Sequence, residues 1–293
     1  MSGKLKLIGV GDNVVDVYRN KGVMYPGGNA LNFAVYNSLR GADAAFLGVF
    51  GTDYPGVYNR AVLDSIGIDY SHSRVVQGEN GRCCINLEGN DRVFLESNKC
   101  GVLREHPLVF SDEDKRYLRK FDWIHTTVSS YLEKELPTLC ELNVPISYDF
   151  SDCFLEDDLK ALSPYLTLAC LSCSHLPQEE MRKCMETIFL SGCPYILATR
   201  GKEGAFFYDG TEYYVQEAVP SNAIDTLGAG DSIAAVFVYE YAAGCLKAGI
   251  KIKGKPDPER SEIIRRALRE GAAFASKTCE KHGAFGFETY FML

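Results

Sequence analysis

Short apolar segments alternate with amphipathic helical segments over most of this 293-residue chain. Strands that alternate with helices join through right-handed crossovers into a largely parallel sheet that helices cover on both faces. The apolar segments are nearly continuous, which fits strands buried on both sides. We therefore predict an α/β fold of three layers, α/β/α, around a largely parallel central sheet. The predicted strands are residues 5–10, 44–50, 121–128, 145–150, 166–172 and 194–199, and the predicted helices are residues 28–40, 53–66, 131–142, 155–163 and 177–190.

Two segments interrupt this alternation. Residues 18–27 are short and turn-rich, and residues 79–100 contain two strand patterns that meet at Gly89, Asn90 and Asp91, which are typical of a hairpin turn. Because a hairpin is not stable alone, we expect these segments to form a small β lid over the body or over a partner subunit. The predicted body consists of residues 1–17, 28–78 and 101–293, and it turns helical from residue 228 onward.

Composition and charge exclude several kinds of partner. The net charge of −8 argues against nonspecific binding of nucleic acid, although it allows a magnesium-complexed nucleotide. No apolar run approaches the roughly 20 residues that a membrane-spanning helix needs. The amino-terminal apolar segment is too short for a secretory signal, so we expect a cytoplasmic protein. The 11 cysteines are scattered through apolar segments, which is typical of reduced core residues.

The segment DTLGAGD, residues 225–231, is the first of four candidates for chemistry. Its glycines suit a tight turn or a close approach to a ligand, and consecutive amides at a helix start can hold an anion. Asp231 would then lie within reach of both the anion and a substrate hydroxyl. A capped helix after a tight turn explains the same residues equally well.

Two further candidates lie near the amino terminus. Asn29 and Asn32 are three residues apart at the start of a predicted helix, so their amides share one face and can hydrogen-bond sugar hydroxyls. The alternative is that Asn29 only caps the helix. Asp12 follows the first strand, where open α/β sheets place ligand contacts, and a carboxylate there suits a neutral polyol. Asp16 fits the same use or a solvated turn.

The fourth candidate is TRGKEG, residues 199–204, directly after a predicted strand. Its glycines permit close approach of a nucleotide, and Arg200 or Lys202 can meet phosphates, but the pattern is also common in strand-to-strand turns. The absence of a Walker A sequence excludes the usual P-loop kinase, and no G-x-S-x-G elbow supports hydrolysis. We interpret the histidines, which show no ligand-like spacing, as ordinary core or surface residues; they are His72, His106, His125, His175 and His282.

In this order, the motifs resemble the ribokinase-like (PfkB) family of carbohydrate kinases over nearly the whole chain. The resemblance is carried by GDNVVD (11–16), GGNALN (27–32), the inserted hairpin, TRGKEG (199–204) and IDTLGAGDSIAAVF (224–237). The last string is the most specific, because the second signature of the family has the form D-T-x-G-A-G-D. Within the family, the segments GDNVVDVY, GGNALNFAVY, NDRVF, YDFSD and KTCEKHGAFG are most similar to fructoselysine 6-kinases.

The resemblance implies roles at the sugar side of the site. Asp231 is the base that takes the proton from the sugar hydroxyl, and the amides of Gly228, Ala229 and Gly230 stabilise charge on the transferred phosphoryl group. The residues expected to bind the sugar are Asp12, Gly28, Asn29 and Asn32, with Asp16 and Arg92 as further candidates. For the charged tail of fructoselysine, the candidates are Asp91, Arg92, Tyr148 and Asp149.

The resemblance also implies a nucleotide site and two cations. ATP is expected beside Thr199, Gly201 and Gly204, with the helix of Ala272 and Ser276 flanking the adenine. Mg²⁺ accompanies the nucleotide. A monovalent cation such as K⁺ is expected at Asp225 and the Thr226 carbonyl, near the backbone of Cys279 and Gly283.

Two departures from the family pattern bear on these roles. The N-x-x-E motif linked to magnesium and phosphate is replaced by LSCSHLPQEE, in which Ser172 and Glu179 are only loose counterparts. Asn29 stands where ribokinases usually carry lysine, which suggests a substrate other than ribose.

The function implied is an ATP-dependent kinase that phosphorylates a primary hydroxyl of fructoselysine or a similar ketosamine, with the β lid as a dimer contact. The alternatives are a fructose, nucleoside or other sugar kinase of the same family, and a catalytically silent sugar sensor on the same fold. A sensor has no need of a base, so the intact Asp231 argues against silence. A dinucleotide-dependent reductase is disfavoured because Gly9-Val10-Gly11 lacks the third glycine of its fingerprint.

Overall fold

The computed structural model describes residues 4–88 and 91–291, with the side chains of residues 87, 88, 91 and 92 left undescribed. Its main feature is a nine-stranded sheet in which seven neighbouring strands run parallel and an antiparallel hairpin forms one edge. In spatial order the strands are β13 (Tyr213–Gln216), β12 (Ala205–Tyr208), β11 (Tyr195–Thr199), β10 (Leu168–Ser172), β9 (Ile146–Asp149), β8 (Trp123–Thr127), β1 (Lys6–Gly11), β4 (Asp43–Gly51) and β5 (Arg74–Val76).

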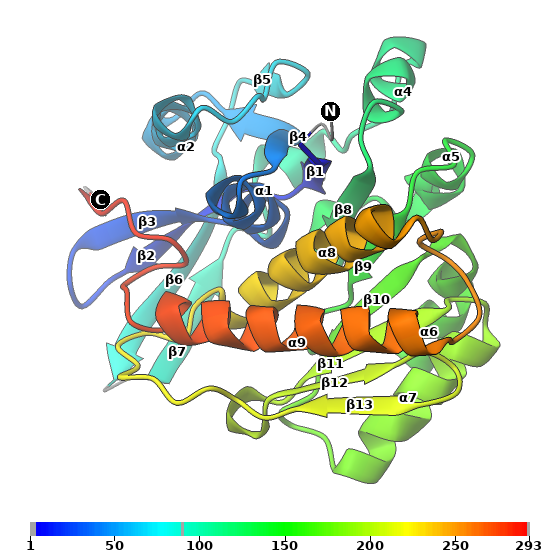
Figure 1. Ribbon diagram of the computed structural model, residues 1–293. Helices are drawn as coiled ribbons and strands as arrows, with labels where there is room; N and C mark the ends of the chain where they lie inside the picture. The colour runs from blue at the N-terminus through cyan, green and yellow to red at the C-terminus, as the bar shows by residue number, and fades with distance from the viewer. Residues whose placement is uncertain (1–3, 89–90, 292–293) are drawn as a thin grey trace.

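Helices cover both faces of this sheet, which confirms the predicted α/β/α layers (Figure 1). One layer contains α1 (Asn29–Arg40), α2 (Tyr54–Ile66), α8 (Ala229–Ala248) and α9 (Pro258–Thr278). The other contains α3 (Val102–Glu105), α4 (Asp112–Leu118), α5 (Leu136–Cys140), α6 (Glu156–Leu162) and α7 (Gln178–Leu190). The helix predicted over 131–142 is shorter, because a 3₁₀ turn over Glu133–Glu135 precedes α5, which has Pro137 in its first turn.

Alternation along the strands divides the core into two layers. Leu7 and Trp123 pack against α1 and α8, whereas their neighbours Ile8 and Ile124 pack on the opposite side. These apolar strands are buried on both faces, as their sequences predict. The same alternation decides which polar side chains of the central strands face α1 and α8.

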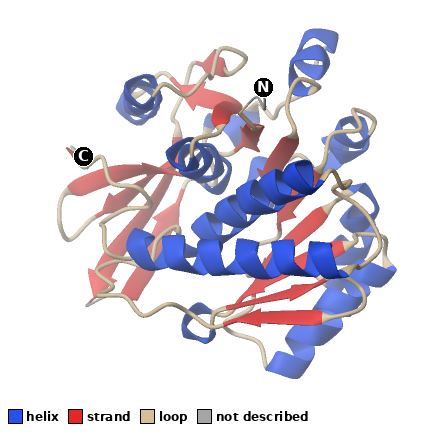
Figure 2. Ribbon diagram, viewed as in Figure 1, coloured by secondary structure: helices blue, strands red, loops and turns tan. Residues whose placement is uncertain are grey.

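A second, five-stranded sheet lies beside the main sheet, near the carboxyl terminus (Figure 2). Its order is β14 (Thr289–Tyr290), β3 (Val23–Gly27), β2 (Val14–Tyr18), β6 (Gly81–Glu88) and β7 (Asp91–Ser97). The sheet therefore extends beyond the segments 18–27 and 79–100 of the predicted lid, since β2 begins in the predicted body and β14 comes from the end of the chain. Strands β6 and β7 pair antiparallel as expected, but the predicted turn at 89–90 lies outside the described residues.

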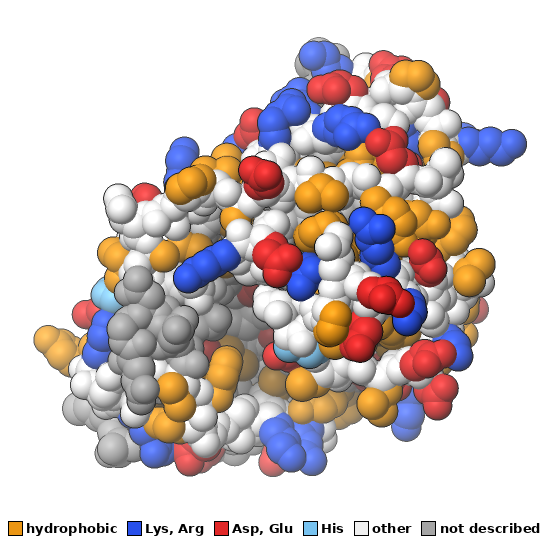
Figure 3. All heavy atoms as spheres, turned by 90° about the horizontal axis from the view of Figure 1, so that it is seen from below, with side chains coloured by type: hydrophobic (Ala, Val, Ile, Leu, Met, Phe, Trp, Pro, Cys, Tyr) orange, Lys and Arg blue, Asp and Glu red, His pale blue; other side chains and the backbone are white. Residues whose placement is uncertain are grey.

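The surface carries charges of both signs. On the face seen in Figure 3, lysine and arginine side chains are interspersed with aspartate and glutamate rather than collected in one basic patch. Within residues 4–88 and 91–291, no helix is long and apolar enough to cross a bilayer.

Candidate active site

Helix α1 begins at a point where only glycine fits. Gly28 has φ 108°, and a Cβ on it would lie 2.8 Å from the Asn13 Cα. The carboxylate of Asp12, at the end of β1, accepts hydrogen bonds from the backbone amides of Asn29 at 2.8 Å and Ala30 at 3.0 Å. Asp12 therefore caps α1 with its side chain, although it lies far from the helix in the sequence. Asp12, and not Asn29, is the residue that caps this helix.

Burial raises the pKa of Asp12, and hydrogen bonds oppose that shift. Besides the two amides, Oδ1 accepts from the hydroxyls of Thr127 at 3.2 Å and Ser130 at 3.3 Å. The Asp12 carboxylate, predicted to bind the sugar, thus accepts hydrogen bonds from at least four protein groups. Asp12 is 3% exposed and lies at the start of α1. Contact between Asp12 and a sugar stays a prediction.

Helix α8 begins next to α1 (Figure 1). Gly228 is its N-cap residue, in the left-handed conformation with φ 73°, and the Ala229 amide donates to the Thr226 carbonyl at 3.3 Å. Asp231 lies in the first turn, where the helix dipole favours a carboxylate. Its Oδ1 accepts from Asn29 Nδ2 at 3.0 Å, and its Oδ2 accepts from Asn32 Nδ2 at 2.6 Å. The two asparagines share a helix face, as predicted, and that face meets Asp231.

Two more carboxylates lie near this pair of helix starts. Asp149, at the end of β9, accepts from Asn29 Nδ2 at 2.8 Å and from the Ser151 amide at 2.8 Å, while burial raises its pKa. Asp16 is a buried residue of β2, not a solvated turn residue. A Cβ on Gly27 would overlap an Asp16 carboxylate oxygen, so the glycine that precedes Gly28 makes room for this side chain.

His125 is part of the site, although its spacing from the other histidines is not ligand-like. It lies on β8, 1% exposed, and its Nε2 is 2.8 Å from Asn29 Oδ1. Burial lowers its pKa to about 3, so the imidazole is neutral. The pattern that could have pointed to His125 is the two-residue period of a strand. It places the side chains of Trp123 and His125 on the same face of the sheet, the one that α1 covers.

The end of β11 approaches the start of α8. A Cβ on Gly230 would lie 3.8 Å from Thr199 Oγ1, so these two predicted phosphate-side residues are neighbours. Gly201 and Gly204 both have positive φ in the tight connection from β11 to β12, which the Arg200 amide closes by donating to the Gly204 carbonyl at 2.8 Å. TRGKEG is thus a strand-to-strand turn, and its nucleotide contacts stay a prediction.

Helix α9 packs along α8 and carries the residues predicted to flank adenine. Ala272 is buried, and Ser276 Oγ donates to the Pro220 carbonyl at 3.0 Å. The segment around Pro220 therefore lies against α9, and adenine binding beside Ala272 and Ser276 stays a prediction.

The loop before α8 is joined to the loop after α9. The amides of Ile224 and Asp225 both donate to the Cys279 carbonyl, and the buried Asp225 carboxylate accepts from the Gly283 amide at 3.0 Å. Tyr18 of β2 also donates to this carboxylate. The predicted cation residues Asp225 and Thr226 are therefore close in space to Cys279 and Gly283.

Two further residues considered for this site, Tyr148 and Glu179, lie elsewhere. Tyr148 faces the opposite core layer, where its hydroxyl donates to Glu133 at 3.1 Å. The Glu179 side chain is 82% exposed and paired with Lys183. Asp91 and Arg92 belong to β7, but their side chains lie outside what the structure describes.

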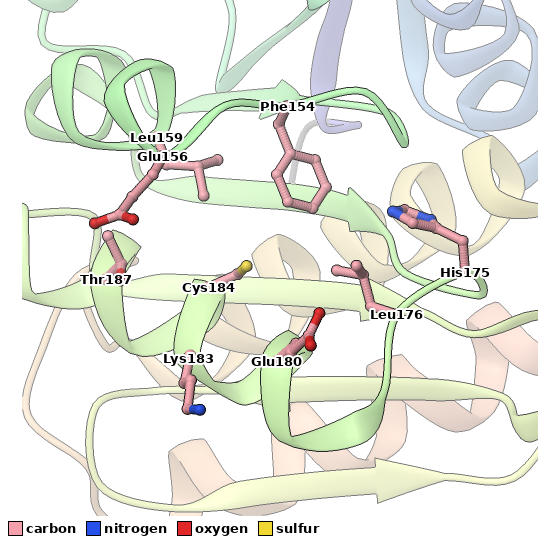
Figure 4. A pocket seen from close by; sticks show the side chains of 9 residues that line it. All are labelled: Phe154, Glu156, Leu159, His175, Leu176, Glu180, Lys183, Cys184 and Thr187. Atoms are coloured by element: carbon pink, nitrogen blue, oxygen red, sulfur yellow. The ribbon is translucent and has the colours of Figure 1, made fainter.

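A hollow of about 260 Å³ lies on the other face of the sheet, between α6 and α7 (Figure 4). It contains none of the predicted site residues. The residues that line it are Phe154, Glu156, Leu159, His175, Leu176, Glu180, Lys183, Cys184 and Thr187.

Residues 5–288 match the family described as pfkB family carbohydrate kinase. Fructosamine kinase FrlD of Bacillus subtilis is 39% identical over 284 residues, which cover 97% of this chain and 94% of that protein. Fructoselysine 6-kinase of Escherichia coli is 31% identical over 278 residues, with coverage of 94% and 98%.

Solved structures show the same fold. A ribokinase from Giardia lamblia superposes with a TM-score of 0.78 at 16% identity, over 96% of this chain and 95% of that chain. Arabidopsis thaliana ribokinase complexed with ribose and ATP gives a TM-score of 0.74 at 19% identity, over 97% and 95%. This likeness confirms the ribokinase-like fold.

The two glycines that bound α8 allow a matched test of the turn before Asp231. Both have positive φ, but a Cβ on Gly228 would overlap the Tyr36 hydroxyl, whereas one on Gly249 meets nothing within 4 Å. We expect Gly249→Ala to lower the free energy of unfolding by about 1 kcal/mol through backbone strain. Gly228→Ala should lower it by about 3 kcal/mol, because steric overlap adds to the strain. Urea unfolding measures both, and equal losses would contradict this description of the turn.

Proposed function

Because the chain belongs to the pfkB family of carbohydrate kinases, we propose that it transfers the γ-phosphoryl group of ATP to a primary hydroxyl of fructoselysine or a similar ketosamine. The observation that carries this proposal is the Asp231 carboxylate at the start of α8, held by the amides of Asn29 and Asn32. A base in a fixed orientation beside a glycine turn is what phosphoryl transfer to a hydroxyl requires.

In the proposed reaction, Asp231 accepts the proton of the sugar hydroxyl while the hydroxyl oxygen bonds to the γ-phosphorus. The bond from that phosphorus to the β–γ bridging oxygen breaks, and ADP leaves. Each Asp231 oxygen accepts one amide hydrogen bond, and a carboxylate oxygen can accept a further one from substrate. The backbone at residues 228–230 and the dipole of α8 stabilise the charge that develops on the phosphoryl oxygens.

ATP would lie along the ends of β11 and α9. Thr199 is a neighbour of Gly230, which supports a γ-phosphate position between β11 and α8. Gly201 permits close approach of the nucleotide to the turn, whereas the missing Cβ of Gly204 makes room for the Gln216 carbonyl. Ala272 and Ser276 belong to the helix that we propose flanks the adenine.

The two expected cations differ in how well the chain fits them. Within residues 4–88 and 91–291, there is no group of three or more His, Cys, Asp or Glu side chains that could hold a metal ion. Mg²⁺ bound mainly by ATP phosphates needs no such site. For K⁺, Asp225 and the Thr226 carbonyl supply oxygen ligands in the joined loops before α8 and after α9.

A cationic substrate suits the charge of this site. Asp12, Asp149 and Asp231 surround Asn29, and Asp16 lies beside Gly27. A ketosamine carries a protonated amine next to its sugar, whereas fructose is neutral. The fructosamine and fructoselysine kinases that resemble this chain act on such compounds by name. Among the four carboxylates, Asp149 stands at the end of β9 and shares the Asn29 amide nitrogen with Asp231, and we assign it to the amine.

The second sheet supports the proposed homodimer through the β lid. Strand β7 is an edge strand, and its Val93, Phe94 and Leu95 are 40%, 66% and 43% exposed. An apolar edge strand invites pairing with another chain.

Phe94→Asp should convert a dimer into a monomer in light scattering, while Leu190→Asp, at an 83% exposed leucine on α7, should not. A wild-type monomer would contradict this assembly.

Replacement of Asp231 tests the proposed base. Asp231→Asn keeps the size of the side chain but cannot accept the proton, so kcat for ADP formation should fall by roughly 10²–10⁴-fold with little change in sugar KM. Asp209→Asn is the control, because Asp209 likewise accepts a hydrogen bond within the protein, from Tyr214 beside the β12–β13 turn, but is not one of the predicted site residues, so its kcat should stay near wild type. Near-normal turnover by Asp231→Asn would remove this residue from catalysis.

Replacement of Asp149 tests the substrate class. If Asp149 pairs with the substrate amine, Asp149→Asn should lower kcat/KM for fructoselysine about 10-fold more than kcat/KM for fructose, since a desolvated charge pair is lost only with the cationic substrate. Competition assays with both sugars measure the ratio directly. An equal fall for both sugars would leave Asp149 with a role that is independent of the amine.

A further inference from the structure

His125 lies in the centre of the main sheet, below the start of α1. In register it is the neighbour of Gly9 on β1 and Ser147 on β9. A Cβ on Gly9 would overlap the Ala30 carbonyl, so this glycine allows α1 to approach the sheet closely. The imidazole stacks on Phe33 of α1, with ring centroids 4.4 Å apart. The helix start that carries Asn29 therefore lies directly over this imidazole.

The hydrogen bonds that connect Trp123, Ser147 and His125 are compatible with one assignment of donors and acceptors. Trp123 Nε1 can only donate, and it donates to Ser147 Oγ at 2.9 Å. The Ser147 hydroxyl, 2.8 Å from His125 Nδ1, is then able to donate its own hydrogen to that nitrogen. A neutral imidazole that accepts at Nδ1 carries its proton on Nε2, and this nitrogen lies 2.8 Å from Asn29 Oδ1.

The contacts of the Asn29 amide require the same tautomer of His125, with the proton on Nε2. Asn29 Nδ2 faces two carboxylates, Asp149 Oδ2 at 2.8 Å and Asp231 Oδ1 at 3.0 Å. Because carboxylates accept, the amide nitrogen must point toward them and Oδ1 must point toward His125. The Asn29 end thus fixes one direction, from Ser147 through His125 and Asn29 to Asp231, and the hydrogen bond that Trp123 donates to Ser147 is compatible with it.

We propose that His125 is a positioning residue of the kinase: its Nε2–H holds the Asn29 amide so that both amide hydrogens point at Asp149 and Asp231. The inference rests on the proposed function, because it makes the orientation of the base depend on a buried residue that does not touch substrate. Without the imidazole donor, the Asn29 amide can rotate, and Asp231 loses a fixed hydrogen bond on one of its two oxygens.

Aromatic and amide replacements separate this role from simple packing. His125→Phe keeps the stack on Phe33 and the burial, but removes the donor. His125→Gln places an amide donor near the position of Nε2. We expect His125→Phe to lower kcat by about 10-fold with KM for magnesium-ATP unchanged, and His125→Gln to return kcat to within about threefold of wild type. His106→Phe, at an exposed histidine, is the matched control and should have wild-type kcat.

The tautomer can be measured without any variant. In ¹⁵N-labelled wild-type protein, long-range ¹H–¹⁵N correlation spectra should show His125 neutral, with its proton on Nε2. Ser147→Ala removes the hydroxyl donor to Nδ1, so it should produce a mixture of tautomers and lower kcat by several-fold even if His125→Phe does not fold.

The proposal is overturned if His125→Phe turns over at the wild-type rate, if His125→Gln and His125→Phe are equally impaired, or if the wild-type imidazole carries its proton on Nδ1. The spectra also separate this inference from the proposed function. If wild-type protein forms no ADP with any sugar, the proposed function fails, and the kinetic role of His125 fails with it, although an Nε2–H imidazole would still establish the chain of hydrogen bonds.

Discussion

The Asn29 amide lies between two carboxylates, the buried Asp149 and the partly buried Asp231, and the arrangement of the site depends on this contact. One amide nitrogen reaches both Asp149 and Asp231, so it joins the end of β9 to the start of α8. Placing several carboxylates in one buried region is costly unless each is hydrogen-bonded. The amides of Asn29, Asn32 and Ser151 that donate to Asp149 and Asp231 are uncharged, so they hold these carboxylates in place without neutralising them. Ionised carboxylates in this position would favour a cationic sugar, in line with the proposed substrate class.

The fold supplies this contact through the ends of its parallel strands. Strands β1, β8, β9 and β11 end at the same edge of the sheet, and the polar residues Asp12, Thr127, Asp149 and Thr199 stand at or just beyond those ends. Helices α1 and α8 start above that edge, each after a glycine with positive φ. One edge of the sheet thus brings together the capping residue, the proposed base and the proposed phosphate-binding residues, which lie far apart in the sequence.

Much of this could be predicted from the sequence, because buried strands and glycine-bounded helix starts leave local signals. The apolar runs located six of the seven parallel strands of the main sheet to within about two residues but missed the short β5, and DTLGAGD located the start of α8 and its aspartate. The partners of each polar group could not be predicted. Asp12 caps a helix that starts 17 residues later, Asp16 is buried in a strand although a solvated turn was one of its two interpretations, and His125 reaches Asn29 from 96 residues away. Such contacts are set by the crossing of strands and helices, which single-sequence patterns do not encode.

The measurement that tests the central claim most directly is ADP formation from magnesium-ATP with fructoselysine, fructose, ribose, adenosine and fructose 6-phosphate, each supplied separately to wild-type protein. A kinase with a negatively charged sugar site should give its highest kcat/KM with fructoselysine, a lower value with fructose, and little ADP with adenosine or fructose 6-phosphate. Preference for a neutral sugar would contradict the ketosamine assignment. No ADP with any of the five compounds, together with intact sugar binding, would contradict catalysis itself and favour a sensor built on a kinase fold.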